Sequence, residues 1–357
     1  MILALVLVGF GLLMIYSASS ILAMRTYGDS YYFIKRQLVW AGLGFGGMWL
    51  LARTPYGRFR GWVLPGLIAC VMLLLAVLLL PLGKSVGGAR RWLALGPLSF
   101  QPAEMLKLVL VVYLADALVR KQALMREFSK GVVPHLVVAG GLAGLLLLQP
   151  DLGTAVIIVA VTVAMLFIGG ARLAHLFGLG LAALPVVFLL IFKVAYRRRR
   201  WDAFLDPWQD ALGKGFQIVQ SFLALGSGGL WGRGLCESQQ KLFYLPTPHT
   251  DFIYSIVGEE LGFAGAFAVL LVFGGLIWKG FSIARNCPDR FGKMLAVGLT
   301  MLLGLQAFIN IGVTTGLVPT KGTTLPFVSA GGSSLLFSLL AIGILLSISS
   351  HAVREEE

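Results

Sequence analysis

Residues 131–170 read GVVPHLVVAGGLAGLLLLQPDLGTAVIIVAVTVAMLFIGG, two long apolar runs that meet at Pro150-Asp151. A helix needs roughly 20 predominantly apolar residues to cross a bilayer. Each run, 131–149 and 152–170, comes close to that length, and the two residues between them leave room only for a tight hairpin. The stretch therefore predicts two consecutive membrane-spanning helices.

The composition of the whole chain agrees with this prediction. Of the 357 residues, 58% are hydrophobic and 13% are charged, and the mean hydropathy is +0.87. A soluble domain of this length would expose much of that apolar surface to water, so the bilayer is the solvent that fits. We expect an all-α polytopic membrane protein, a single membrane domain over residues 1–357, with about ten transmembrane helices. Their expected ranges are 1–20, 37–52, 61–82, 100–119, 131–149, 152–170, 173–194, 251–278, 292–317 and 332–349.

Charge and cysteine content narrow the class further. The formal net charge of +13 suggests contact with anionic membrane lipids rather than nucleic acid, and no nucleic-acid-binding motif occurs. The cysteines Cys70, Cys236 and Cys287 show neither pairing nor metal-ligand spacing. We therefore expect no disulfide framework, no zinc site and no nucleic-acid partner.

Two polar segments interrupt the apolar pattern. Residues 83–99 combine several glycines with basic residues. Residues 195–250, between the seventh and eighth expected spans, are too long for an ordinary connection, and such loops are usually functional or disordered. Because this loop mixes apolar and polar residues and contains aromatics such as Trp201 and Trp208, we expect ordered, partly interfacial structure with short amphipathic helices.

The distribution of basic residues does not decide the orientation. An even number of spans puts both termini on one side, and the short connections on that side are richer in Lys and Arg, which favours cytoplasmic termini. The long loop, with its run Arg197–Arg200, then places further basic residues outside. The residues alone leave the orientation open.

Several ionisable side chains lie inside or at the ends of expected spans, where insertion costs roughly 2.5–3.5 kcal/mol each. Glu104 and Lys107 are three residues apart on one helix face, so they either pair to join helices or line a polar cavity. Asp151 precedes a helix and suits an N-cap or a cavity wall. For Glu259 and Glu260 in the eighth span we favour a structural role.

Asp251 stands where the long loop meets the eighth apolar run. A carboxylate at this depth is shielded from water yet reachable by a substrate, which suits a general base. Because Asp251 also precedes a long helix, an N-cap is the alternative. The glycine-rich segments 226–229 and 331–334 offer backbone N–H groups to an anion, the second at a helix N-terminus.

Short motifs are spread along the chain in a specific order. They are Tyr16-Ser17-Ala18-Ser19-Ser20, Gly88-Ala89-Arg90-Arg91-Trp92, Phe100-Gln101-Pro102-Ala103-Glu104 with Lys107, Gln149-Pro150-Asp151-Leu152-Gly153-Thr154, Gln220-Ser221 with Gly226-Ser227-Gly228-Gly229, His249-Thr250-Asp251-Phe252-Ile253 with Gly258-Glu259-Glu260-Leu261-Gly262, and Leu325-Pro326-Phe327-Val328-Ser329 with Gly331-Gly332-Ser333-Ser334. Over most of the chain, their joint order and spacing resemble the SEDS family of peptidoglycan glycosyltransferases, which includes RodA and FtsW.

Three positions depart from the usual pattern of that family. Ala103 stands in place of Ser, Thr247 in place of Glu and Ala330 in place of Tyr, which affects loop shape and substrate contacts more than the Asp251 carboxylate. The resemblance implies about ten spans, cytoplasmic termini and a large extracytoplasmic loop at residues 195–250. It leaves open whether the protein serves elongation or division.

The resemblance also implies a function at the outer face of the bacterial cytoplasmic membrane. This is the polymerisation of lipid II, a disaccharide-pentapeptide on undecaprenyl pyrophosphate, beside a class B penicillin-binding protein that crosslinks the product. We predict inverting transfer with Asp251 as the general base. No residue cluster demands a metal, although a divalent cation could assist the leaving group. The predicted substrate-binding residues are Arg90, Arg91, Glu104, Lys107, Asp151, Arg197, Arg198, Lys321 and Ser333.

Two other functions remain open. A polar intramembrane cavity built from Glu104, Lys107 and Asp151 would also suit a flippase that moves a charged head group. A scaffold that recruits a partner through residues 195–250 would tolerate substitution of Asp251. Polymerisation of lipid II that is already on the outer leaflet distinguishes the enzyme from both.

Overall fold

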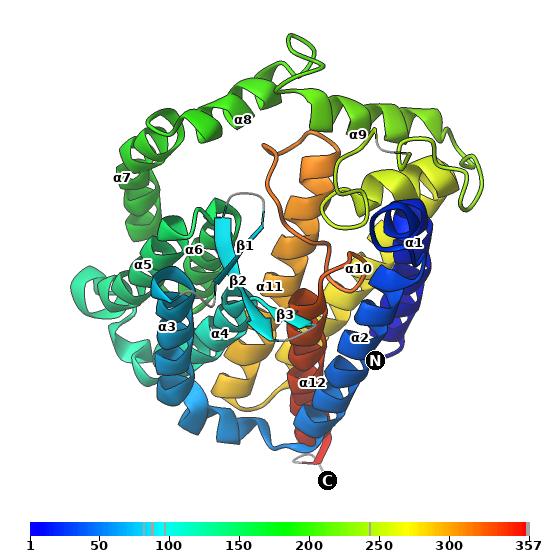
Figure 1. Ribbon diagram of the computed structural model, residues 1–357. Coiled ribbons are helices and arrows are strands. Elements are labelled where there is room, and N and C mark those ends of the chain that lie inside the picture. The colour runs from blue at the N-terminus through cyan, green and yellow to red at the C-terminus, as the bar shows by residue number, and fades with distance from the viewer. Residues whose placement is uncertain (81–82, 87–88, 96–97, 243, 355–357) are drawn as a thin grey trace.

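A computed structural model describes residues 1–357 apart from 81–82, 87–88, 96–97, 243 and 355–357. Gly88, which belongs to one of the motifs above, lies outside the described residues. The described chain is mostly helical (Figure 1). Its α-helices are α1 (Ile2–Tyr27), α2 (Tyr32–Arg53), α3 (Val63–Leu79), α4 (Pro102–Arg120), α5 (Val133–Leu148), α6 (Leu152–Ile168), α7 (Leu173–Phe192), α8 (Ala195–Leu205), α9 (Phe216–Ser227), α10 (Ile253–Asn286), α11 (Arg290–Thr314) and α12 (Gly332–Arg354), with short helical turns η1 (Tyr56–Trp62), η2 (Gln122–Leu124) and η3 (Phe128–Val132).

Each of the ten expected spans coincides with one of these helices. By length and composition, seven helical stretches of the described chain could cross a membrane, while α6, with 17 residues, is apolar but shorter. The protein is therefore a polytopic membrane protein. The seven stretches are Ile2–Tyr27, Tyr56–Leu79, Phe128–Leu148, Leu173–Phe192, Ile253–Asn286, Arg290–Thr314 and Gly332–Ser350.

The predicted hairpin between α5 and α6 is confirmed. Asp151 is the N-cap of α6: its carboxylate accepts hydrogen bonds from the amide of Thr154 (3.2 Å) and from the Thr154 hydroxyl (2.9 Å). The Gln149 side chain fastens the turn to α3 by donating to the carbonyl of Leu74 over 2.9 Å. Such a cap satisfies orphan amide groups at the start of a helix.

The all-α expectation is confirmed except for a small antiparallel sheet between α3 and α4. Its strands are β1 (Gly83–Val86), β2 (Ala89–Leu95) and β3 (Leu98–Phe100), in the order β1-β2-β3. Here the chain folds back across the end of the bundle, where its backbone groups need partners, and strand pairing supplies them. The segment is short and glycine-rich, so its sequence carried no strand signal.

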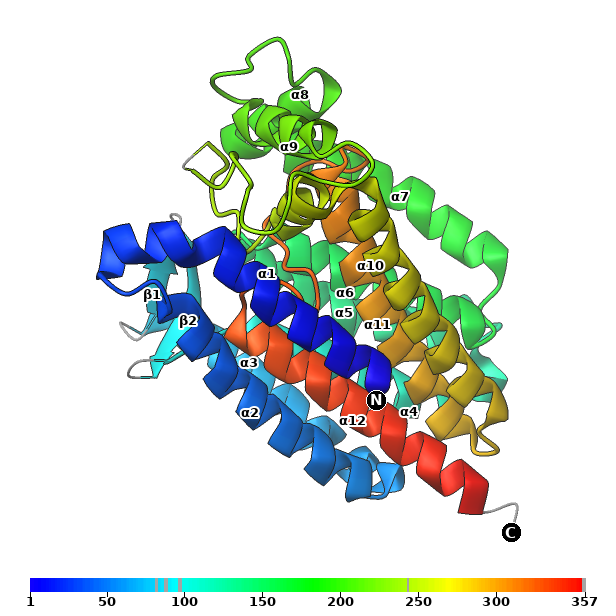
Figure 2. The ribbon, with the colours of Figure 1, turned by 90° about the vertical axis from the view of Figure 1, so that its right-hand side faces the viewer.

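Close helix packing depends on small residues along α2 and α12. Gly44 and Gly47 of α2 face Leu339 and Leu340 of α12, and Gly343 faces the backbone of Met48. Figure 2 shows α1, α2 and α12 running side by side. Small residues allow membrane helices to approach closely and pack by dispersion.

The helix α7 differs from the rest because none of its residues is buried. It stands apart from the bundle, and α8 and α9 form an arch that leads from its end back to α1 and α10 (Figure 1). The prediction of ordered structure with short helices in residues 195–250 is thus confirmed. The arch and the sheet lie at one end of the bundle, and both termini lie toward the other (Figure 2).

The long helix α10 is broken at Gly262, whose backbone has φ 68° and ψ −167°. Residues 229–234 of the preceding loop enter the break. The amides of Phe263 and Ala264 donate to loop carbonyls over 2.9 and 3.1 Å, and the amides of Arg233 and Gly234 donate to the carbonyls of residues 259 and 260 over 3.0 Å each. Only glycine readily adopts this conformation.

Candidate active site

Asp251 lies two residues before α10, which begins at Ile253 with Phe252 at the N-cap position and no capping side chain. The alternative that Asp251 caps this helix is therefore wrong. Across the described chain, no hydrogen bond to the Asp251 carboxylate is found, so its oxygens are available to a substrate.

The backbone around Asp251 is held from two elements. The side-chain amide of Asn310 in α11 donates to the carbonyl of Asp251 over 3.0 Å and to the carbonyl of Thr323 over 2.6 Å. The Ser329 hydroxyl donates to the carbonyl of Thr250 over 2.6 Å. These hydrogen bonds fix the backbone from which the Asp251 side chain extends. The carboxylate is therefore held in place before a substrate binds.

The connection between α11 and α12 forms one wall beside Asp251. A Cβ placed on Gly322 would lie 3.2 Å from Oδ2 of Asp251. The neighbouring Thr323 and Lys321 lie against Gly153, at 3.2 and 3.9 Å from a Cβ placed there. The structure therefore brings the start of α6 and the predicted Lys321 to the Asp251 segment.

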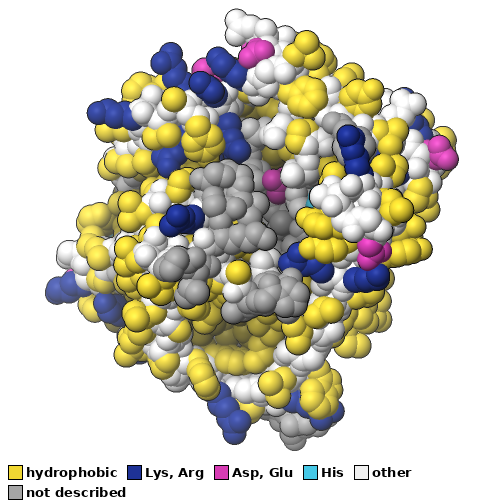
Figure 3. Space-filling model, in the orientation of Figure 1, with side chains coloured by type: hydrophobic (Ala, Val, Ile, Leu, Met, Phe, Trp, Pro, Cys, Tyr) yellow, Lys and Arg dark blue, Asp and Glu magenta, His cyan; other side chains and the backbone are white. Residues whose placement is uncertain are grey.

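Burial raises the pKa of Asp251 to about 6, while the positive charges of Arg200 and Arg91 act in the opposite direction. Asp251 is partly exposed to solvent, but protein atoms surround its carboxylate on most sides. This is the environment expected at the floor of a hollow. Figure 3 shows such a hollow in this face of the molecule, with an acidic side chain inside it and basic side chains around it. Burial also lowers the pKa of Lys321.

The two arginines that face Asp251 are themselves anchored to loops. Arg200 donates to the carbonyl of Thr320 over 3.1 Å. Arg91 donates through Nε to the carbonyl of Gln149 over 3.1 Å and through Nη2 to the carbonyl of Pro150. Their guanidinium groups keep free donors, so both can stabilise an anion near Asp251.

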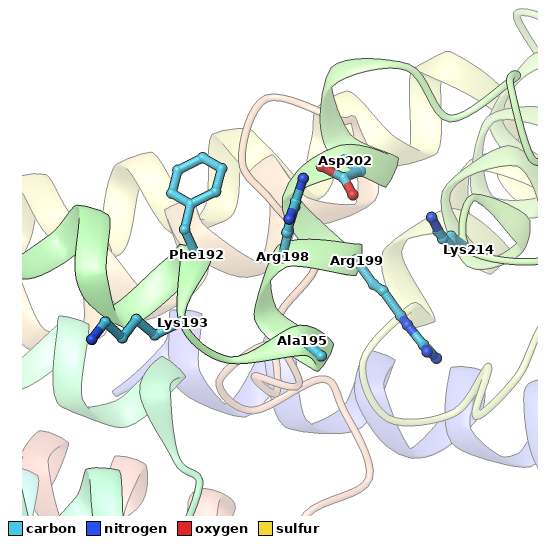
Figure 4. Close-up of a pocket in the computed structure, with 7 residues that line it drawn as sticks. All are labelled: Phe192, Lys193, Ala195, Arg198, Arg199, Asp202 and Lys214. Carbon is cyan, nitrogen blue, oxygen red and sulfur yellow. The ribbon is translucent and has the colours of Figure 1, made fainter.

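The other arginines of the run Arg197–Arg200 face elsewhere. Arg197 donates to the carbonyl of Leu190 over 3.1 Å. Arg198 lines a separate cavity of about 370 Å³ with Phe192, Lys193, Ala195, Arg199, Asp202 and Lys214. In Figure 4 the end of Arg198 lies beside Asp202, and Lys193 points away from both. A helix turn thus divides four consecutive arginines between two faces of α8.

The remaining predicted residues occupy distinct places. Glu104 and Lys107 form a buried ion pair with 2.8 Å between Oε1 and Nζ, as their spacing predicted. The Ser333 hydroxyl accepts from the amide of Gln101 over 3.0 Å, which ties α12 to the start of α4. Arg90 is exposed. Their contacts with a substrate stay predictions.

The glycine-rich segments serve close packing. Gly332 lies against the ring of Trp40, and Gly228 lies against the backbone of Gly258, so no side chain would fit at either position. The amide of Gly331 donates to Oε1 of Gln37 over 3.2 Å. An anion-binding role for these segments also stays a prediction.

A metal ion has no ready ligand set here. Within the described ranges, no group of three or more His, Cys, Asp or Glu side chains is placed to hold one. The donors beside Asp251 are mostly cationic, which suits an anion better than a cation.

Asn310 is a contact of the Asp251 segment that the sequence analysis did not single out. In the sequence, Asn310 stands out only as a polar amide residue inside the expected span 292–317. In the structure, Asn310 is 1% exposed. Because a buried amide is normally hydrogen-bonded, such a residue marks a contact between elements, although its partner cannot be read from the sequence.

Comparison with known proteins agrees with the resemblance. A family described as "Cell cycle protein", which covers FtsW, RodA and SpoVE, matches residues 1–354. "Probable peptidoglycan glycosyltransferase FtsW" of Geobacter sp. (strain M18) is 44% identical over 348 residues, 98% of this chain and 95% of that protein. "Stage V sporulation protein E" of Bacillus subtilis (strain 168) is 44% identical over 351 residues, 98% of this chain and 96% of that protein.

A solved structure described as "Structural coordination of polymerization and crosslinking by a peptidoglycan synthase complex" has the same fold. It superposes with a TM-score of 0.81 at 33% identity and covers 98% of this chain and 96% of that chain. Sequence and fold therefore agree over nearly the whole length, and this chain belongs to the FtsW/RodA/SpoVE family.

Proposed function

We propose that this protein is a peptidoglycan glycosyltransferase that polymerises lipid II at the outer face of the bacterial cytoplasmic membrane, with Asp251 as the general base. Family membership and the names of its relatives support the activity. The observation that carries the residue assignment is the carboxylate of Asp251, which accepts no hydrogen bond from the described residues, has a pKa of about 6 and faces the positive charges of Arg200 and Arg91.

In the proposed reaction, the Asp251 carboxylate takes the proton from the 4-hydroxyl of the acceptor lipid II. The oxygen then forms a bond to the anomeric carbon of the donor, the growing chain on its lipid carrier. The bond from that carbon to the pyrophosphate oxygen breaks, the electron pair leaves with the lipid pyrophosphate, and the configuration inverts. A positioned base contributes typically 10²–10⁴-fold to such a rate.

Positive charge supports departure of the pyrophosphate. The charges of Arg91 and Arg200 act on Asp251, and Lys321 belongs to the loop beside it. Fixed cations of this kind stabilise charge that develops on a leaving group. No step is assigned to a metal ion. The buried pair Glu104–Lys107 and the capping residue Asp151 are proposed to shape the cavity rather than to touch the reacting atoms.

We further propose ten spans with cytoplasmic termini, so that the sheet, α8, α9 and Asp251 face the cell exterior. Both termini lie at the end of the bundle away from these elements, which supports the arrangement (Figure 2). The related solved structure is described as coordinating polymerisation and crosslinking, which supports a class B penicillin-binding protein as partner. The FtsW name of several relatives favours division over elongation.

The test is polymerisation of lipid II by the purified protein, with glycan chains separated on a gel. Wild type is expected to make polymer from lipid II added in detergent, which requires no flipping, and Asp251→Ala is expected to make none. Asp202→Ala removes a carboxylate on the other side of α8 and serves as the matched control, with wild-type activity expected. Normal glycan chains from Asp251→Ala would overturn the assignment.

A further inference from the structure

A group of buried charged and polar side chains lies on α10, on the loop before it and on α1, and the proposed reaction does not use it. Glu259 and Glu260 are 0% exposed, Ser17 is 1% and Lys241 is 6%. Removing ions from water costs several kcal/mol each even after relaxation. These side chains are therefore retained only because their partners are placed to satisfy them.

Glu260 joins three elements. The Ser17 hydroxyl of α1 lies 2.6 and 2.8 Å from the two carboxylate oxygens, and Nζ of Lys241 donates to Oε1 over 3.0 Å. Lys241 Nζ also lies 3.3 Å from the Ser17 hydroxyl, which closes a triangle of contacts. We call Ser17, Lys241 and Glu260 the buried clamp.

Glu259 holds the neighbouring loop residues. Its carboxylate accepts from the Ser238 hydroxyl over 2.5 Å and from the amides of Gln239 and Gln240 over 2.9 and 3.3 Å. The guanidinium of Arg233 lies 3.8 Å away. Two successive glutamates thus fix residues 238–241 against α10.

The clamp stands at the start of the segment that leads to Asp251. Lys241 precedes Asp251 by ten residues, and the described residues between them, 242 and 244–250, are called the return segment. The amide of Leu245 donates to the carbonyl of Gln240 over 2.9 Å, so the segment continues directly from the clamped residues. Its far end is held by Asn310, as described above.

We infer that Ser17, Lys241 and Glu260 are positioning residues for glycan transfer: they tie the return segment to α1 and α10 and so hold Asp251 in place. The inference rests on the proposed role of Asp251. A misplacement of about 1 Å at a reacting group can cost about 10²-fold in rate. A buried ion pair by itself is weak evidence for stability, since apolar replacements are often neutral.

The decisive variant removes both charges together. Lys241→Met with Glu260→Gln leaves no unpaired charge, so the apparent Tm in detergent is expected to stay near that of wild type. The kcat for lipid II polymerisation is expected to fall about 10- to 100-fold, with little change in KM. The single variant Lys241→Arg keeps the positive charge and the contact with Glu260, so it should retain most of the wild-type polymerisation activity. Glu237→Gln, an exposed residue of the same loop, is the control and should match wild type.

A pH profile separates positioning from plain structural support. A loosened return segment admits water to Asp251, so the acidic limb of kcat/KM should move from about 6 toward the ordinary 3.8. Arg200 and Arg91, whose charges lower the pKa of Asp251, are unchanged in the variant. If the clamp only stabilised the fold, the double variant would have a smaller folded fraction, and the acidic limb of its kcat/KM profile would stay at the wild-type pH.

Two results would overturn the inference. One is a wild-type kcat in the double variant with Tm preserved. The other is a loss of activity that matches the loss of folded protein, with an unmoved acidic limb. Asp251→Ala is assayed in parallel: full activity there would remove the base assignment on which positioning rests, whereas an inactive Asp251→Ala beside a fully active double variant would overturn positioning alone.

Discussion

The side-chain amide of Asn310 donates to the backbone carbonyls of both Asp251 and Thr323, over 3.0 and 2.6 Å. One buried amide therefore holds the proposed base and the loop beside it at a fixed separation. The helix α11, which contributes no predicted catalytic group, acts on the site through this contact.

Asn310→Ala should lower the kcat of glycan polymerisation by about 10- to 100-fold, because Asp251 loses its fixed origin. Two buried carbonyls also lose a donor, which costs about 1–3 kcal/mol for each group left unsatisfied. Gln306→Ala removes a buried amide about one turn earlier on α11 and is the control. Equal kcat values for the two variants, at matched folded fractions, would contradict the role of Asn310.

Polymerisation should depend on the ionised form of Asp251, whose pKa is raised to about 6. We expect kcat/KM to rise as the pH increases through about 6 and then to level off. Arg200→Ala removes a charge that lowers this pKa, so the limb should move to higher pH. Arg198→Ala, which alters the separate cavity on α8, should leave the limb in place. An acidic limb at the same pH in Arg200→Ala and wild type would contradict the placement of Arg200 beside Asp251.

Asp251 should also make the folded protein less stable near neutral pH. Its folded-state pKa of about 6 lies above the ordinary 3.8, so the folded state binds more protons between these values and stability falls as the pH rises through them. Asp251→Asn cannot ionise and should therefore melt at a higher temperature than wild type above about pH 6. Melting curves at pH 4 and pH 7.5 test this, and a constant difference between the two proteins would argue against it.

The buried pair Glu104–Lys107 allows structure and activity to be separated. Lys107→Met leaves Glu104 charged and unpaired, which should destabilise the protein by about 3–5 kcal/mol. Adding Glu104→Gln removes that charge and should restore the melting temperature. If the pair shapes the substrate cavity, the restored double variant should still polymerise about tenfold more slowly. Full activity in the double variant would leave the pair as a structural contact.

The apolar helices and the α5–α6 hairpin could be predicted because they depend on local sequence. Apolar length fixes a span, and Pro150-Asp151 carries both a turn and a cap. The pairing of Glu104 with Lys107 follows from helical periodicity. Each of these features is decided within a few residues of chain.

The remaining site contacts depend on residues far apart in the sequence. Nothing in the sequence distinguishes the four arginines Arg197 to Arg200 from one another. The orientation of α8 places Arg200 toward Asp251 and Arg198 toward the separate cavity. Asn310 reads as a polar interruption until α11 is placed beside the Asp251 segment. The N-cap alternative for Asp251 failed because α10 begins two residues later than the apolar pattern suggested.

The break at Gly262 makes the helix α10 depend on the loop before it. Around it, the amides of Phe263 and Ala264 and the carbonyls of Glu259 and Glu260 find their partners in residues 229–234. In hydrocarbon, each unsatisfied backbone group costs several kcal/mol. The backbone of α10 around Gly262 therefore has its full set of hydrogen bonds only while residues 229–234 are docked in the break.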